Sequence, residues 1–232
     1  MKRFFTTALS ALLILPSLAQ HTVDVAVFSI NDFHGAFVRS DHKGIAGAPA
    51  VWQTLDSLKR VYPLNVTVSA GDNFGGSYFY NATQGVLMPV LFNDLGIRLS
   101  ALGNHEFDDG QRRLAEKWST SPLRPAGWDI RYVCANVRST ETGRVPEFAQ
   151  PTAVVEVPVS DNRRVSIAFE GLIASSTPQQ VSVRRIGGLS FDGRYASVVD
   201  SVAATSDGKC LKEATVRLLL THVGTCMNAK TG

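Results

Sequence analysis

Apolar residues follow two alternating spacings through the first half of the chain. Short runs rich in β-branched residues predict buried strands at 23–30, 65–70, 98–102 and 131–135. Between these runs, apolar positions three and four residues apart predict helices at 49–60, 85–95 and 111–118. Pro63 follows the first predicted helix and Gly96 the second, as expected for helix ends. Strands that alternate with helices are typical of an α/β fold with parallel strand pairing.

The pattern changes in the second half. Two apolar runs, 152–159 and 163–172, flank Ser160-Asp161-Asn162 and predict an antiparallel hairpin. A helix is expected at 195–204 and a late buried strand at 214–221. No internal repeat, low-complexity tract or linker interrupts the chain, so residues 20–232 are interpreted as one layered α/β domain.

The first nineteen residues have the features of a secretory signal peptide. Lys2 and Arg3 precede an apolar stretch at 8–15, and Pro16 is followed by small residues before a cleavage site after Ala19. The alternatives are a membrane anchor or a buried strand, but the stretch is shorter than the roughly 20 residues that a bilayer-spanning helix needs. No later apolar run is long enough for a transmembrane helix. We therefore expect an exported mature chain, periplasmic or extracellular, with no transmembrane segment.

Composition and charge exclude several classes. The chain has 232 residues, of which 44% are hydrophobic and 19% charged, which excludes a disordered or collagen-like protein. The formal charge of +3 includes Lys2 and Arg3, and no basic run occurs elsewhere, so no nucleic-acid partner is expected. Among the three cysteines, Cys134 lies in an apolar run and is predicted to be a core residue. A disulfide between Cys210 and Cys226 is left open.

Four polar clusters each follow a predicted strand, and their side chains suit a metal site. They are Asn31-Asp32-Phe33-His34-Gly35, Gly71-Asp72-Asn73, Gly103-Asn104-His105-Glu106-Phe107-Asp108, and His222. Loops at the carboxyl ends of strands converge on the ligand site of open α/β sheets. Carboxylate, amide and imidazole ligands favour Zn, Mn, Fe or Mg over a thiolate-bound metal. One carboxylate, Asp72, can bridge two divalent ions, and such pairs clamp a phosphoryl group and generate a hydroxide nucleophile near neutral pH.

His105 and Asp108 are predicted to act as a pair. They are three residues apart, so their side chains meet if the segment forms a helical turn. The carboxylate would orient the imidazole and favour its charged form, and a protonated His105 could stabilise or protonate a leaving oxygen. Each cluster alone is common in turns or core edges, but the four in this order favour a functional site.

At these residues the sequence resembles the calcineurin-like metallophosphoesterases, and within them the secreted 5′-nucleotidase / UDP-sugar hydrolase family. The resemblance extends from about Val23 to Gly224. Its matching segments are Asn31 to Gly35, Ser69 to Asn73, Leu102 to Asp108, Cys134-Ala135-Asn136-Val137, Gly171-Leu172 with Thr177-Pro178, and Thr221-His222-Val223-Gly224.

The resemblance implies a four-layer αββα sandwich and a hydrolase for phosphate monoesters of nucleotides, small molecules that would be the partners of the protein. By the family pattern, one metal would be held by Asp32, His34 and Asp72, and the second by Asp72, Asn104 and His222. His105 and Asp108 would stabilise the transition state.

The sequence also departs from the family pattern. A Gly-His-x-His or Gly-His-x-Gln loop, which supplies one further ligand to each metal in the family, is absent after His222, and so is the C-terminal nucleotide-binding domain. The chain is therefore interpreted as the catalytic portion alone, incomplete at its C-terminus. Two alternatives stay open: an exported, non-catalytic or weakly active remnant, and a related enzyme for a cyclic nucleotide, a UDP-sugar or a sulfur-linked compound.

Overall fold

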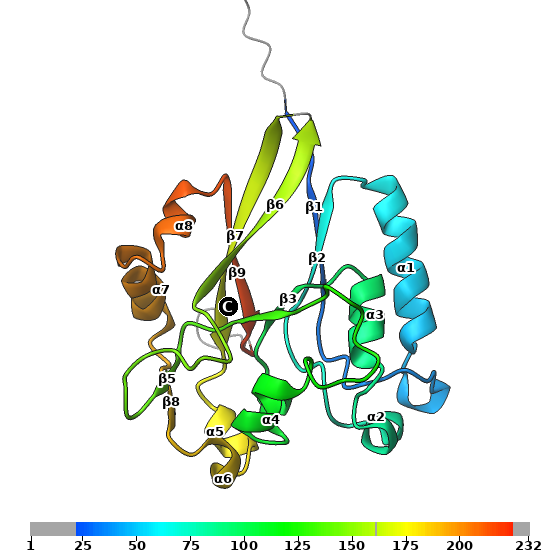
Figure 1. The fold of residues 1–232 in the computed structure, drawn as a ribbon, viewed down its shortest axis with the longest axis horizontal. Helices are drawn as coiled ribbons and strands as arrows, with labels where there is room; N and C mark the ends of the chain where they lie inside the picture. The colour runs from blue at the N-terminus through cyan, green and yellow to red at the C-terminus, as the bar shows by residue number, and fades with distance from the viewer. Residues whose placement is uncertain (1–21, 161, 225–232) are drawn as a thin grey trace, which may run out of the picture.

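Two β-sheets lie face to face, and helices cover the outer face of each (Figure 1). The structure, a computed structural model, describes residues 22–160 and 162–224. The predicted signal peptide, residues 1–19, and Cys226 lie outside these residues.

The first sheet is parallel throughout, as the alternation of strands and helices predicted. Its strand order is β1-β2-β3-β4. The strands are β1 (Ala26–Ile30), β2 (Asn65–Ser69), β3 (Leu99–Ala101) and β4 (Arg131–Val133). β1 pairs with β2 from Ala26 opposite Asn65 to Ile30 opposite Ser69, so both strands end at the same edge.

The second sheet contains the predicted hairpin and the late strand. β6 (Thr152–Ser160) is antiparallel to β7 (Arg163–Ile173), and β7 is parallel to β9 (Val216–His222). β1 and β9 were predicted to be buried, but β1 has no buried residue and β9 only Leu220, because both lie at sheet edges. A small third sheet pairs β5 (Val137–Ser139) with β8 (Leu189–Phe191). These two strands were not predicted, because a polar residue interrupts each of them and neither contains a continuous apolar run.

The helices are α1 (Ala48–Val61), α2 (Tyr78–Thr83), α3 (Met88–Asp94), α4 (Gln111–Glu116), α5 (Thr177–Gln180), α6 (Val183–Ile186), α7 (Tyr195–Ala204) and α8 (Lys209–Glu213). All four predicted helices are present, as α1, α3, α4 and α7. The predicted helix at 85–95 is shorter in the structure, and the short helices around residues 78, 177, 183 and 209 were not predicted.

Three hydrophobic cores fill the spaces between four layers. The first core packs α1 and α3 against the parallel sheet, through Leu55 and Phe92 among others. The second joins the two sheets, through residues such as Val68 and Phe169. The third packs α7 and α8 against the second sheet, through residues such as Val198 and Leu211. The order helix, sheet, sheet, helix is the expected αββα sandwich (Figure 1).

A glycine lets the two sheets touch. A Cβ atom on Gly171 in β7 would lie 2.1 Å from the carbonyl oxygen of Val133 in β4. The amide of Ala135 donates to the carbonyl of Gly171 at 2.7 Å. The neighbouring Cys134 is fully buried, as predicted, and burial raises the pKa of its thiol to about 12.

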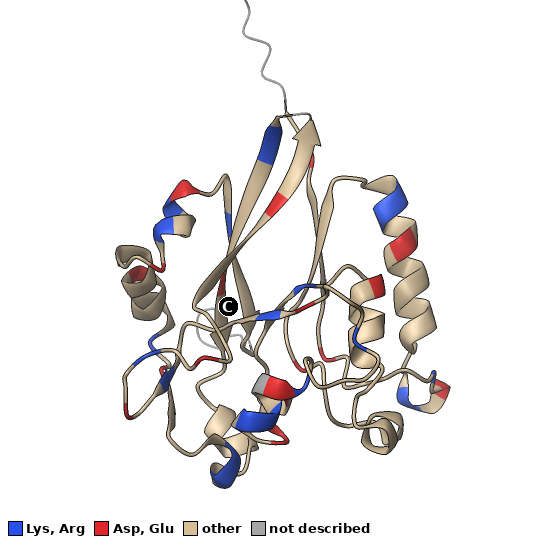
Figure 2. Cartoon of the chain, viewed as in Figure 1, with Lys and Arg blue, Asp and Glu red and all other residues tan. Residues whose placement is uncertain are grey.

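Charges of both signs alternate over the surface. Figure 2 shows basic and acidic residues together on α1 and on α8. In the part of the chain that the structure describes, no helix combines the length and the apolar character that crossing a bilayer requires.

Glu170 in β7 is a buried acid that should make stability depend on pH. It is 2% exposed, and its Oε1 atom has no hydrogen-bond partner among the described residues. Burial and the nearby charge of Asp200 raise its pKa to about 7. The folded state therefore holds a proton that the unfolded chain releases above roughly pH 4.5, so the free energy of unfolding should fall as the pH rises from there to about 7.

Glu170→Gln should remove this dependence. We expect the variant to gain about 1–3 kcal/mol in the free energy of unfolding at about pH 8 and little at about pH 5, measured by urea denaturation. Glu156→Gln, at an exposed position of β6, is the control. An equal gain at both pH values would show that ionisation of Glu170 is not the cause.

Candidate metal centre

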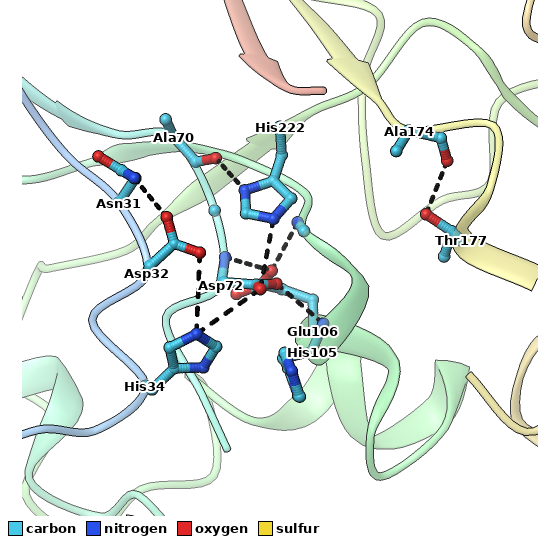
Figure 3. Close-up of polar contacts among 12 residues, drawn as sticks. Asn31, Asp32, His34, Ala70, Asp72, His105, Glu106, Ala174, Thr177 and His222 are labelled. Carbon is cyan, nitrogen blue, oxygen red and sulfur yellow. Dashed lines mark hydrogen bonds and ion pairs between the residues drawn. The ribbon is translucent and has the colours of Figure 1, made fainter. Parts of the chain in front are cut away.

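Four of the five predicted ligands, Asp32, His34, Asp72 and His222, gather where strands of both sheets end (Figure 3). Asp32 and His34 follow β1, and Asp72 follows β2. Asn104 and His105 begin a short 3-10 helix, η2 (Asn104–Phe107), which follows β3. His222, the last of the predicted ligands, ends β9 in the other sheet. The site thus lies across the junction of the two sheets.

Backbone hydrogen bonds continue the pairing of β1 and β2 into their loops. The amide of Asp32 donates to the carbonyl of Gly71 at 3.1 Å, and the amide of His34 donates to the carbonyl of Asp72 at 3.0 Å. Gly71 is required there, because a Cβ atom on it would lie 2.7 Å from the amide nitrogen of Gly103. The two ligand loops are therefore held in a fixed register.

Three of the predicted ligand positions have a left-handed backbone. The φ angles are 50° at Asp32, 49° at His34 and 53° at Asp72, and only one other non-glycine residue with positive φ, Gln84, is found in the ranges described. Such conformations cost about 1–3 kcal/mol each and concentrate at functional sites. The strain at these three positions is therefore evidence for function that is independent of the side chains.

Asp72 is the central carboxylate. It is 4% exposed, and its Oδ2 atom lies 3.3 Å from Nε2 of His222 and 3.8 Å from Nε2 of His34. Its Oδ1 atom accepts a hydrogen bond from the amide of His105 at 2.9 Å. Burial opposes ionisation, but the hydrogen bonds from His222 and from the His105 amide outweigh it and lower the pKa of Asp72.

Backbone carbonyl groups orient both imidazoles. Nδ1 of His34 lies 3.2 Å from the carbonyl oxygen of Phe74, and Nδ1 of His222 lies 2.9 Å from that of Ala70. A carbonyl only accepts, so each Nδ1 carries the hydrogen and each Nε2 faces Asp72. Burial disfavours the charged form of His222, but the hydrogen bond and charge of Asp72 outweigh burial and raise its pKa to about 9.

Two sets of potential ligand atoms share Asp72. One set is His34, Asp72 and His105, and the other is Asp32, Asp72 and His222; within each set the atoms lie within 4.8 Å of one another. This division differs from the predicted one, in which Asp32 and His34 share an ion. Asn104 is placed beside His105 at the start of η2. The first set also contains His105, which was predicted to transfer a proton and not to hold an ion. The ligand roles of all five predicted residues stay a prediction.

This donor set fits divalent cations. It offers carboxylate oxygens and imidazole nitrogens close to one another. In His34 and His222, the hydrogen bond at Nδ1 orients the ring so that the Nε2 atom faces the site.

His105 and Asp108 form the predicted pair. Nδ1 of His105 lies 2.7 Å from Oδ2 of Asp108. Burial lowers the pKa of His105, but the hydrogen bond and charge of Asp108 outweigh it, and the net pKa is raised. The guanidinium of Arg185 in α6 lies 3.9 Å from Oδ1 of Asp108. The ring of His105 is nearly perpendicular to that of His34, with 4.8 Å between centroids.

Glu106 is the residue that the sequence analysis missed. Its fully buried carboxylate accepts hydrogen bonds from the amides of Asp72 at 2.9 Å, Asn73 at 2.8 Å and Gly103 at 2.6 Å. Burial and the charge of Asp72 raise the pKa of Glu106, although the three amide donors act to lower it. Its place in the Gly-Asn-His-Glu motif was a signal, but no role follows from the motif alone.

A second set of hydrogen bonds, made by the side chain of Asn73, holds the loop that follows β2. The Asn73 side chain accepts from Ser69 Oγ at 2.5 Å and donates to Ser100 Oγ at 2.9 Å, so it links β2 to β3. Gly103 is also required, since a Cβ atom on it would lie 2.1 Å from Oδ1 of Asp72. The backbone amide and the Oδ1 atom of Asp72 are therefore held in place by Glu106, His105 and Gly103.

Comparisons with known proteins agree with this architecture. No family model matches the chain. It is 31% identical over 209 residues to the cell wall protein Lmo0130 of Listeria monocytogenes, covering 78% of this chain and 26% of that protein. It is 25% identical over 202 residues to the 5′-nucleotidase of Rattus norvegicus, covering 76% of this chain and 34% of that protein. The chain thus spans about a quarter to a third of the length of these relatives.

The fold has solved counterparts. The calcineurin-like phosphoesterase YfkN of Bacillus subtilis superposes with a TM-score of 0.66 at 19% identity, covering 88% of this chain and 63% of that chain. The four-layer architecture expected from the sequence is therefore found in a phosphoesterase. The chain has the calcineurin-like phosphoesterase fold and is related in sequence to the 5′-nucleotidases.

Proposed function

We propose that the chain is a metal-dependent phosphoesterase that hydrolyses phosphate monoesters of nucleotides with two divalent cations, of which Zn, Mn, Mg and Fe are candidates. The observation that carries the proposal is the buried, ionised Asp72, which belongs to both sets of ligand atoms. A carboxylate shared in this way is the arrangement that holds two cations together.

The side chains divide into holding and proton-transfer roles. Asp32, His34, Asp72, Asn104 and His222 would hold the cations, which when bound supply Lewis acidity to the phosphoryl group and to the attacking water. His105 donates its Nδ1 hydrogen to Asp108, which leaves Nε2 as the atom that stabilises or protonates the leaving oxygen. The raised pKa of His105 favours the protonated form that this role requires.

Substrate and location are inferred from the relatives. A related protein is named a 5′-nucleotidase, which supports nucleotides as the substrate class. Another is named a cell wall protein, which together with the signal-peptide pattern of residues 1–19 supports export. Residues 20–232 would then be the phosphoesterase domain of a nucleotidase-like protein.

Metal removal tests the proposal directly. We expect hydrolysis of p-nitrophenyl phosphate to vanish in excess chelator and to return on addition of Mn²⁺ or Zn²⁺, with about two ions bound per chain by elemental analysis. Undiminished hydrolysis in chelator would refute the metal mechanism. Two bound ions without any turnover would instead support the non-catalytic alternative.

A further inference from the structure

A large pocket adjoins the candidate metal centre on the side of His34 and His105. Its volume is about 780 Å³, and it lies between the loop that follows β1 and the start of α2. His34 and His105 form one wall, which places the pocket next to the Nε2 atom expected to face the leaving oxygen. A group leaving from the phosphorus would therefore be directed into this pocket.

The opposite walls combine aromatic and cationic side chains. Tyr78 is 89% exposed, and Phe79 packs on Phe37 with 5.1 Å between ring centroids. The charged lining residues are Arg39 and Lys43, and no carboxylate lines the pocket. Arg39 is paired with Asp41 at 2.6 Å, whereas no ion pair of Lys43 is found in residues 22–160 and 162–224. Lys43 thus gives the pocket a net positive charge.

The pocket is attached rigidly to the ligand loops. Ser77 Oγ donates to the carbonyl of Gly35 at 2.7 Å and accepts from the amide of Tyr80 at 2.9 Å. Gly35 also lies against Tyr80, since a Cβ atom on this glycine would be 2.5 Å from Cβ of the tyrosine. The aromatic wall is therefore preorganised relative to His34, the neighbour of Gly35.

We propose that this pocket is a subsite for the alcohol part of the phosphate ester and that it selects an aromatic group carrying a second negative charge. The inference rests on the proposed function and narrows its substrate class: the alcohol part of a nucleoside monophosphate is an uncharged nucleoside, whereas a nucleotide with a second phosphate group carries the additional negative charge. The aromatic ring would lie against Tyr78 and Phe79, and the second anionic group would face Lys43 and Arg39. The walls come from residues 36–45 and 76–79, so the selectivity belongs to the described chain itself.

Matched probes separate this inference from the catalytic proposal. Phenyl phosphate and 4-carboxyphenyl phosphate report hydrolysis, and the corresponding phosphonates, whose C–P bond is not hydrolysed, report binding by calorimetry to the metal-loaded protein. We expect the carboxylated probe of each pair to be preferred about three- to tenfold, in kcat/KM and in Kd. Lys43→Ala should abolish the preference, and Tyr78→Ala should weaken both aromatic phosphonates about three- to tenfold.

Surface residues far from the pocket provide the controls. Lys212→Ala on α8 and Tyr62→Ala at the end of α1 should leave both readouts unchanged. Hydrolysis of both esters at equal rates, or a preference that survives Lys43→Ala, would overturn the subsite and leave the phosphoesterase proposal intact. Selective, Lys43-dependent phosphonate binding without hydrolysis would support the subsite and refute the catalytic proposal.

Discussion

Replacing Asp72 with asparagine is expected to reduce phosphate ester hydrolysis at least about a thousandfold, because one substitution removes the charge shared by both ligand sets. Asparagine preserves the size of the side chain and tolerates the φ angle of 53°, which alanine does not. The amide can also still accept from the backbone of His105. The variant should therefore fold and lose function, measured as kcat/KM at saturating metal.

Two further variants define what that loss means. Asp94→Asn, at an exposed position of α3, removes a charge of the same type and should leave hydrolysis unchanged. Asp32→Asn affects a residue of one ligand set only and should cost less than Asp72→Asn. If the Asp32 and Asp72 variants lose activity equally, the shared position of Asp72 has no special importance.

Glu106→Gln is expected to have the second largest effect. The carboxylate accepts three buried amide hydrogens, whereas glutamine offers one oxygen and turns its NH₂ group toward donors. We expect the free energy of unfolding to fall by about 1–3 kcal/mol, since at least one buried amide loses its acceptor. Metal affinity should fall about 10- to 100-fold, the usual cost of losing a residue that positions a ligand.

The Glu106 experiment needs both readouts, because a structural acid would alter stability alone. Metal affinity is to be measured by competition with a chelator, at a temperature where the variant is fully folded. Glu147→Gln, exposed on the loop before β6, is the matched control. Unchanged metal affinity in the Glu106 variant would show that Asp72 does not depend on it for its position.

The sequence contained most of the architecture, for a definite physical reason. β1 and β2 are β-branched, apolar and flanked by polar loops, so their positions and parallel pairing follow from composition and alternation. Because parallel strands end at one edge, the approach of Asp32 and Asp72 also followed. The alternation of strands and helices along the chain then restricted the fold to layered α/β arrangements.

What the sequence could not predict depends on contacts between segments distant in the chain. The importance of Glu106 comes from amides supplied by two different loops, which no local motif reveals. The segment of α2 has no apolar periodicity over its six residues, so the pocket wall containing Tyr78 stayed hidden. The division of ligands into sets depends on interatomic distances, which sequence order does not determine.

Asp72 follows the first sheet, whereas His222 terminates the second. A cation bound by both residues would join the two sheets, so occupancy of the metal site would raise the free energy of unfolding by mass action. When trace metal is scarce, the protein would lose activity and its two sheets would also separate more readily. Proteolysis of the protein would then be faster when the supply of metal is low.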